Sequence, residues 1–196
     1  MLRLSYPYTA MRSDVAFLQT KQNVYHINYW RWSFYTHVFT SSFVLLAGLT
    51  QFNNYLQQKQ KKIHRAIGYV YVLVVVFVTG PASFLMGLNA NGGMPARASF
   101  TLLSILWITF TALAWRFATK RNLEQHRAFM IRSYALTLSA ITLRIYTFLF
   151  AYFNVDLRPV EIYILTAWLS WLPNLIIAQV LIKFKKSETL EILISK

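Results

Sequence analysis

Cysteine is absent from the 196-residue sequence, and acidic residues are scarce, with six Asp and Glu against 20 Lys and Arg. The absence of cysteine excludes disulfides, thiol catalysis and thiolate metal sites. The acids all fall in tails, in loops or at the ends of expected helices, at Asp14, Glu124, Asp156, Glu161, Glu188 and Glu191. This scarcity disfavours ion transport through an intramembrane carboxylate, and it disfavours a metal site with carboxylate ligands.

The apolar residues, 56% of the chain, are gathered in five long runs at 34–52, 66–88, 100–119, 128–153 and 160–184. Each run is about long enough to cross a hydrocarbon layer of ~30 Å as a helix. We therefore expect an all-α fold, a polytopic transmembrane helical bundle of five spanning helices over residues 33–184. An extramembrane leader (residues 1–32) precedes the bundle, and a cytoplasmic tail (residues 185–196) follows it.

Most of the basic residues behind the net charge of +14 lie on one side of the expected bundle, which we call the lysine-rich side. The loops on the opposite side hold only Arg97 and Arg158. By the positive-inside rule the lysine-rich side faces the cytoplasm, so we expect a multi-pass membrane protein with a cytoplasmic C-terminus. The lipid bilayer is then the expected partner, and nucleic acid is not required to explain the charge. The basic residues of the lysine-rich side are Lys59, Lys61, Lys62, Arg65, Lys120, Arg121, Arg127, Lys183, Lys185, Lys186 and Lys196.

Five crossings with this orientation leave a basic leader outside, with Arg3, Arg12, Lys21 and Arg31. Basic segments are poor candidates for translocation. We therefore expect a longer native form, or a relative, to carry one more helix upstream and to cross six times.

The two halves of the bundle echo each other, because His-Arg-Ala occurs at 64–66 and again at 126–128, where an even-numbered helix begins. Helices two apart in a bundle run in the same direction. The echo therefore predicts a parallel repeat that brings His64 and His126 to one depth.

Several blocks resemble a known family, namely HRAFMIRSYALTLSAITLR (126–144), HVFTSSFVLLAGLTQF (37–52) followed by HRAIGYVYV (64–72), and WLSWLPNLIIA (168–178). They are similar to the bacterial predicted membrane proteins called domain of unknown function 2306, over about residues 35–180. The resemblance implies a helical, multi-spanning architecture rich in His-Arg pairs, located in the bacterial inner (cytoplasmic) membrane. It leaves the activity open.

Two arginines, Arg132 and Arg144, lie inside the fourth apolar run with no acid between them. An arginine at the centre of a spanning helix costs at least ~2.5 kcal/mol on insertion scales, which makes a functional site the default hypothesis. Snorkelling toward the head groups is the alternative. A partner has to be a backbone carbonyl, a neutral side chain, or a bound anion such as a lipid phosphate, a carboxylated cofactor or a haem propionate.

Depth along the helices suggests two polar groups. We expect His37 and Arg144 to share an outer pocket, and Arg132, Gln51 and Asn174 to lie in an inner layer with Gln179. A kink at Pro173 is expected to free a backbone carbonyl that accepts from Arg132, and Asn174 and Gln51 are the candidate neutral acceptors. The alternative is that these groups only pack helices together.

Three functional classes remain open. We favour an accessory or assembly subunit that meets other membrane proteins. The second class is a binder of an anionic amphiphile, either a lipid or a quinone. The third is a redox protein in which His64 and His126 ligate a b-type haem and Arg65, Arg127 or Arg132 bind its propionates. His37 is a further candidate ligand, whereas no nucleophile and base pair indicates a catalytic residue, so enzymatic activity stays undecided.

Overall fold

The fold is entirely helical over the part of the chain that the computed structural model describes, the backbone of residues 5–194 and the side chains of residues 5–184. Short helical segments come first, at Tyr6–Ala10 (η1), Ala16–Lys21 (η2) and Gln22–Tyr25 (α2). The long helix α3 (Asn28–Thr50) and the short helix α4 (Asn54–Gln58) follow. The remaining elements are α5 (Lys61–Val74), η3 (Val75–Thr79), α6 (Gly80–Gly87), α7 (Gly93–Thr119), α8 (Leu123–Thr137), α9 (Ser139–Tyr152), α10 (Pro159–Leu169) and α11 (Leu172–Ile194).

Four helices in the described residues are long and apolar enough to cross a membrane. They are Lys61–Gly87, Gly93–Thr119, Leu123–Tyr152 and Pro159–Phe184. They coincide with the second to fifth apolar runs of the sequence, so four of the five expected crossings are confirmed as candidate spans. The side chains of the tail at 185–196 lie outside the described residues.

Helix α3 corresponds to the first apolar run, but it is not among the four candidate spans. Its middle carries a polar stretch that lowers its hydropathy, at Thr36, His37, Thr40, Ser41 and Ser42. Two of these hydroxyls have partners inside the protein: Thr40 Oγ1 donates to Thr36 O and lies 2.6 Å from Thr79 Oγ1, and Ser41 Oγ donates to Val38 O. A membrane crossing by α3 therefore stays a prediction.

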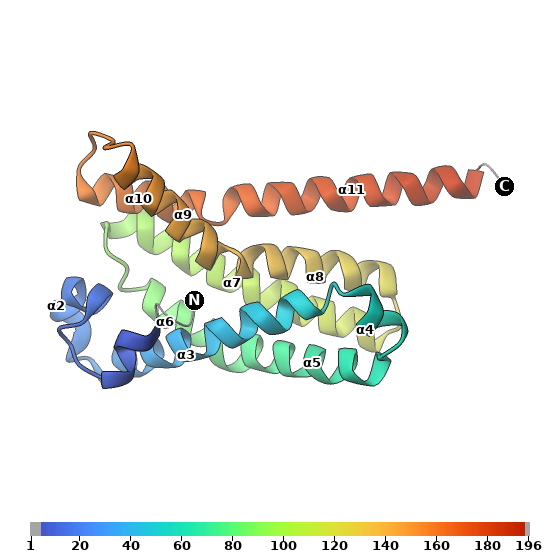
Figure 1. The fold of residues 1–196 in the computed structure, drawn as a ribbon, viewed down its shortest axis with the longest axis horizontal. Helices are drawn as coiled ribbons and strands as arrows, with labels where there is room; N and C mark the ends of the chain where they lie inside the picture. The colour runs from blue at the N-terminus through green and yellow to red at the C-terminus, as the bar shows by residue number, and fades with distance from the viewer. Residues whose placement is uncertain (1–4, 195–196) are drawn as a thin grey trace.

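The long helices lie side by side, with the short helix α4 at one end of the bundle and the N-terminal segments at the other (Figure 1). Helix α7 packs between α6 and α8, α3 packs against α5 and α6, and α11 packs along α8. Helices α9 and α10 pack against each other away from α3. We call the end with α4 and the turn between α7 and α8 the α4 end, and the end with the N-terminal segments the α2 end.

The turns follow from local chemistry. Helix α7 stops where Arg121 takes a left-handed conformation with φ 58°, and Asn122 then caps α8 by accepting from the Gln125 backbone N–H. Asn154, with φ 47°, ends α9 in the same way. Short polar residues at such positions satisfy the orphaned groups at helix ends.

Three of the spanning helices bend. In the first, a π-helical turn (η3) precedes Pro81, which has no N–H to donate to the carbonyl four residues earlier. The third bends at Leu138 between α8 and α9, and the fourth breaks at Ser170 and Trp171, directly before Pro173. The expected kink at Pro173 is therefore present.

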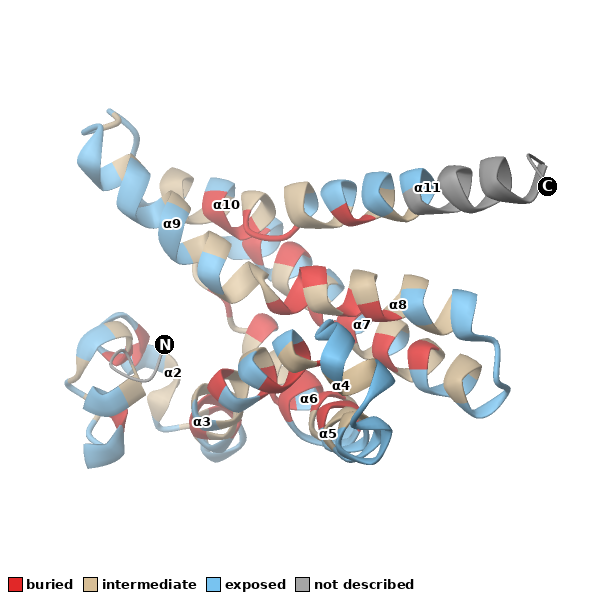
Figure 2. Ribbon diagram, turned by 45° about the vertical axis from the view of Figure 1, so that its right-hand side comes forward, coloured by how far each residue is buried: buried red, intermediate tan, exposed pale blue. Residues whose placement is uncertain are grey.

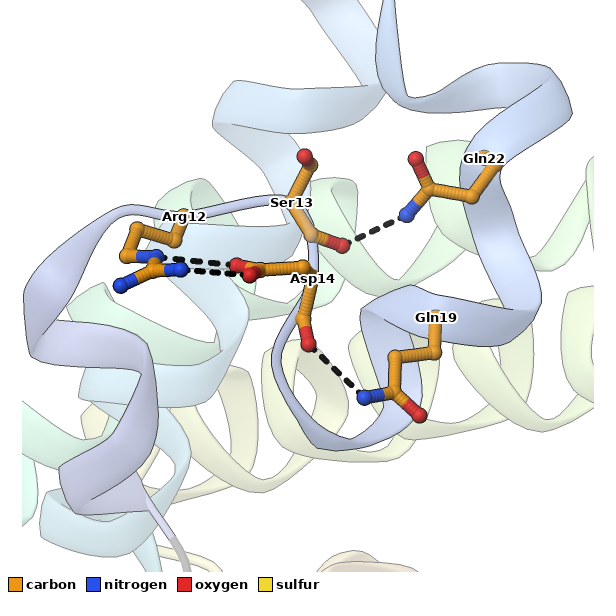
Figure 3. Close-up of polar contacts among 5 residues, drawn as sticks. All are labelled: Arg12, Ser13, Asp14, Gln19 and Gln22. Carbon is orange, nitrogen blue, oxygen red and sulfur yellow. Dashed lines mark hydrogen bonds and ion pairs between the residues drawn. The ribbon is translucent and has the colours of Figure 1, made fainter.

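The N-terminal segment forms a small folded cap at the α2 end. Leu18 and Trp30 are fully buried there, and Phe34 of α3 stacks with Trp30 at 5.6 Å. Figure 3 shows the polar contacts of its outer loop, where Arg12 pairs with Asp14 and Gln19 donates to the Asp14 carbonyl. The leader expected at 1–32 is thus folded against the first long helix over its described residues.

Burial is concentrated where α3, α5, α7 and α8 meet (Figure 2). Val44, Tyr71, Trp107 and Leu136 belong to this core, and each is at most 6% exposed. Many large apolar side chains lie on the outside instead, as expected where lipid replaces water. Helix α9, whose residues are all described, has none that is buried.

Candidate functional site

A pocket of about 150 Å³ opens at the α4 end between α3, α5, α7 and α8. Both His64 and His126 line it, so the structure brings together the two histidines of the sequence echo. Gln51 also lines the pocket, whereas the sequence predicted that it would lie in one layer with Arg132. The other lining residues are Arg65, Gly68, Tyr69, Val72, Trp115, Ala118, Thr119 and Met130.

His126 has a defined proton arrangement. It enters the pocket from the first turns of α8, and its Nδ1 lies 2.8 Å from the backbone oxygen of Ala114 on α7. A carbonyl oxygen only accepts, so Nδ1 carries the proton. In the neutral ring, Nε2 then keeps its lone pair for a ligand, as it does in histidines that bind metals.

His64 and Gln51 are the two pocket residues with unsatisfied polar atoms. Within the described residues, His64 Nδ1 and Gln51 Nε2 are buried and have no hydrogen-bond partner. Such atoms are uncommon in proteins because each costs roughly 1–3 kcal/mol. An acceptor atom of a bound molecule would satisfy Gln51 Nε2, whereas His64 Nδ1 donates or accepts according to its tautomer. Two further buried atoms of the described residues lack a partner, Trp30 Nε1 and Ser42 Oγ, and both lie outside the pocket.

Gly68 makes room for the Gln51 side chain. A Cβ at position 68 would lie 2.9 Å from Gln51 Oε1, closer than real side-chain contacts allow. The absence of a side chain on α5 therefore lets the amide sit against that helix.

Of the two arginines that directly follow the histidines in the sequence, one lines the pocket and the other does not. Arg65 lines the pocket and its Nε donates to the Lys61 carbonyl at 3.3 Å, whereas Arg127 is exposed and is not among the lining residues. Arg132 is also outside the pocket. Of the three arginines expected to bind the propionates of a haem, Arg65 lines the pocket, and Arg127 and Arg132 do not.

The pocket is small for a haem. A cavity of about 150 Å³ is the size that holds benzene, whereas drug-sized ligands occupy roughly 300–1,000 Å³. A porphyrin would require α5 and α8 to separate. Nor does the described part of the chain contain a group of three His, Cys, Asp or Glu side chains that could hold a metal ion.

Arg132 has a neutral partner. Its Nε and Nη2 both donate to Gln179 Oε1, at 3.2 and 2.9 Å, and its guanidinium lies 5.0 Å from the centre of the Phe129 ring. The expectation that Arg132 uses a carbonyl freed by Pro173 is wrong, because its guanidinium donates to the side chain of Gln179, six residues after Pro173 on α11. Arg132 therefore ties α8 to α11.

Asn174 joins α11 to both α8 and α9 at the bend. Its Nδ2 donates to Thr142 Oγ1 at 2.8 Å, and it also lies within reach of the Ala135 and Ser170 carbonyls. The side chain thus satisfies backbone groups exposed by the bends before Pro173 and at Leu138. It is not a partner of Arg132.

His37 and Arg144 do not share one hydrogen-bonded pocket. His37 Nδ1 lies 2.7 Å from Ser83 Oγ, and Ser83 also donates to the Thr79 carbonyl at the π-helical turn. Arg144 is exposed on α9 and donates through Nη1 to the carbonyl of Ala140 on its own helix. His37 therefore lies near the middle of α3, away from the pocket with His64 and His126, which lies beyond the C-terminal end of that helix.

Sequence reasoning missed a buried polar network in the middle of the bundle. Tyr71 OH lies 2.8 Å from Ser133 Oγ and 2.9 Å from Thr137 Oγ1, and Trp107 Nε1 donates to Thr137 Oγ1 at 3.0 Å. Thr111 Oγ1 lies 2.7 Å from Ser133 Oγ and joins α7 to α8. Small hydroxyl residues spaced about one helical turn apart inside the fourth run were the available signal.

Lys21 was also missed, since it was counted only as a charge of the leader. It is 2% exposed, and its Nζ donates to Asn89 O at 2.6 Å and Asn91 Oδ1 at 2.7 Å. Its ammonium also lies over the rings of Phe17 and Trp30. Burial, and secondarily the positive charge of Arg97, lower the pKa of Lys21 to about 8.

Comparison with known proteins agrees with the architecture. Neither curated proteins nor solved structures yield a match. A family model described as "Predicted membrane protein (DUF2306)" matches residues 34–182, which include all four candidate spans almost completely and every pocket residue. The chain therefore belongs to the DUF2306 family of predicted membrane proteins.

Proposed function

We propose that this protein binds the polar head of a membrane amphiphile in the pocket at the α4 end. The observation that carries the proposal is the pair of buried, unpartnered polar atoms on Gln51 and His64 in a pocket shared with His126. These two atoms differ from the other unpartnered buried atoms of the described residues, Trp30 Nε1 and Ser42 Oγ, because they belong to residues that line an open pocket, where a bound molecule can reach them.

The pocket's position supports an amphiphile over a freely soluble ligand. It lies within about three turns of the ends of α5, α7 and α8, where a spanning helix meets the head-group layer. Tyr69 and Trp115 line it and are also partly exposed on the outer surface, so a tail can leave along the lipid-facing side.

The charge distribution supports a cytoplasmic orientation for this end. Five crossings, with α3 as the first, put the α4 end and the C-terminus on the same side, and the basic residues there fit the cytoplasmic face of a bacterial inner membrane. These residues also attract anionic lipids, at about 1 kcal/mol for each Lys or Arg near the surface. The exposed ones include Lys59, Lys61, Lys62, Lys120, Arg121 and Arg127.

Native mass spectrometry of the protein released from mild detergent tests this function. The wild type is expected to retain a small molecule that His64→Leu and His126→Leu lose. His26→Leu is the matched control, since His26 is exposed outside the pocket. If the wild type retains nothing beyond what His64→Leu retains, the pocket has no such ligand.

An accessory or assembly role is the second candidate. Helix α9 supports it, because it has no buried residue and packs mainly on α10, which leaves most of its surface available to another membrane protein. Cross-linking from α9 in intact membranes should then give one stoichiometric partner. A chain that stays uncross-linked at α9 counts against this role.

A b-type haem held by His64 and His126 is the third candidate. Its support is limited to the shared pocket and the free Nε2 of His126. An absorption spectrum of the purified protein, before and after reduction with dithionite, decides it by the presence or absence of a Soret band.

A further inference from the structure

We infer that the ligand of the α4-end pocket is the ring of a quinone, an inference that rests on the function proposed above. The relevant observations are the volume of the pocket, the nature of its walls and the balance of its hydrogen-bonding atoms. Each restricts the chemistry of the head group in a different way.

The volume selects a single six-membered ring. A cavity of about 150 Å³ is the size known to hold benzene. A benzoquinone ring is only slightly larger, and its substituents and tail can extend through the open side. A head group much larger than one ring would not enter.

The walls favour a flat, polarisable ring. Trp115 and Tyr69 supply aromatic surface, and Val72 and Met130 supply apolar surface with one thioether sulfur. Aromatic rings gain from stacked or edge-on contacts, and sulfur beside a ring adds about 0.3–1.5 kcal/mol. A lipid phosphate gains nothing from either contact.

The polar atoms favour a neutral ligand with carbonyl oxygens. Gln51 Nε2 is an N–H donor without an acceptor, so a carbonyl oxygen of the ligand satisfies it without bringing a charge into the pocket. A phosphate, by contrast, would leave water for a site whose lining cation is Arg65 alone, on its exposed rim.

His126 extends the fit to the reduced form of the same ring. With its proton held on Nδ1 by Ala114 O, the neutral imidazole offers an acceptor at Nε2. A hydroquinone O–H can donate to that lone pair, whereas a quinone carbonyl accepts from Gln51. Gln51 Nε2 thus offers a donor and His126 Nε2 an acceptor, which suits both oxidation states of a quinone.

The test is equilibrium binding of a decyl-tailed benzoquinone to the full chain in nanodiscs, with empty nanodiscs subtracted. We expect saturable binding near one molecule per chain. Gln51→Leu should weaken it about tenfold, the factor expected for one lost hydrogen bond in a buried site. Gln58→Leu, a change on the exposed side of α4, should leave it unchanged.

A second variant guards against misfolding. Gly68→Ala brings a methyl group to 2.9 Å from Gln51 Oε1 and should displace the amide while keeping its chemistry. It is expected to weaken binding as Gln51→Leu does. Equal affinities for the wild type, Gln51→Leu and Gly68→Ala would overturn the placement of the ring.

A competing probe separates this inference from the proposed function. Dodecyl phosphate, a single-chain phosphate amphiphile, should not displace the benzoquinone. If dodecyl phosphate binds in a way that needs His64 while the benzoquinone does not bind, the quinone inference fails and the head-group function stands. If neither probe binds, both fail.

Discussion

Two groups of buried polar side chains lie about two helical turns apart in this bundle, and they differ in whether their polar atoms have hydrogen-bond partners. In the middle, Tyr71, Trp107 and Ser133 form a network in which each polar atom has a partner on a neighbouring helix. At the α4 end, Gln51 and His64 each hold a buried atom with none. The first arrangement is typical of interhelical packing and the second of a binding site.

The difference separates stability from function. A hydroxyl that donates and accepts within the bundle lowers the free energy of the folded state, so its removal should be felt in unfolding. An unpartnered amide raises that free energy until a ligand arrives, so its removal should be felt in binding. Mutations in the two regions should therefore give opposite signatures.

The largest effect is expected for Trp107→Ala in the middle network. The substitution removes a side chain that is 6% exposed and leaves Thr137 without its indole donor. Loss of a buried Trp typically costs about 3–5 kcal/mol. Unfolding by SDS in mixed micelles measures it, and Trp115→Ala in the half-open pocket should cost clearly less. Equal costs would break the comparison.

Lys21 at the α2 end sharpens the comparison, because it has partners but no counter-charge among them. The pKa of Lys21 is about 8 in the folded cap and near 10.5 in the unfolded chain. Between these values the unfolded state binds more protons, so stability of the cap should increase with pH, by up to about 3 kcal/mol. Below pH 8 this contribution is absent, because both states are protonated.

The measurement follows unfolding of the cap between pH 7.5 and 10.5 through fluorescence of the nearby Trp30, a range chosen to bracket the two pKa values. Other lysines and tyrosines titrate there as well, so the quantity compared is the difference between wild type and Lys21→Met. A difference that stays constant with pH would show that the Lys21 charge is not buried in the folded cap.

A smaller effect is expected for Tyr71→Phe. The Tyr71 hydroxyl is fully buried and meets Ser133 and Thr137, which retain other partners after its loss. The cost should therefore be about 1 kcal/mol, near the usual value of one hydrogen bond. Tyr69→Phe on the exposed side of α5 is the matched control and should change the free energy of unfolding by less than half as much.

The architecture was largely predictable from the sequence, because long apolar runs can satisfy their backbone in a membrane only as helices. The meeting of His64 and His126 was predictable too, since two helices that run the same way from the same motif begin at one depth. These inferences use only helix direction and length, which the sequence encodes locally.

The partners of the polar groups were not predictable, because they depend on how helices rotate and bend. Arg132 finds Gln179 and not a freed carbonyl, since the break before Pro173 turns α11 along α8. Gln51 reaches the pocket because position 68 lacks a side chain. The folded cap around Lys21 was hidden because its partners, Asn89 and Asn91, are distant in sequence.

The smallest effect, and the one that separates the two regions most directly, is expected for Gln51→Leu in the absence of ligand. Its Nε2 has no hydrogen bond to lose, and leucine has a similar volume without the cost of a buried unpaired amide. The free energy of unfolding should stay within about 0.5 kcal/mol of wild type or increase. A loss above about 1 kcal/mol would mean that the amide is held within the bundle as the hydroxyls around Tyr71 are, and that the α4 end is a second packing network and not a binding site.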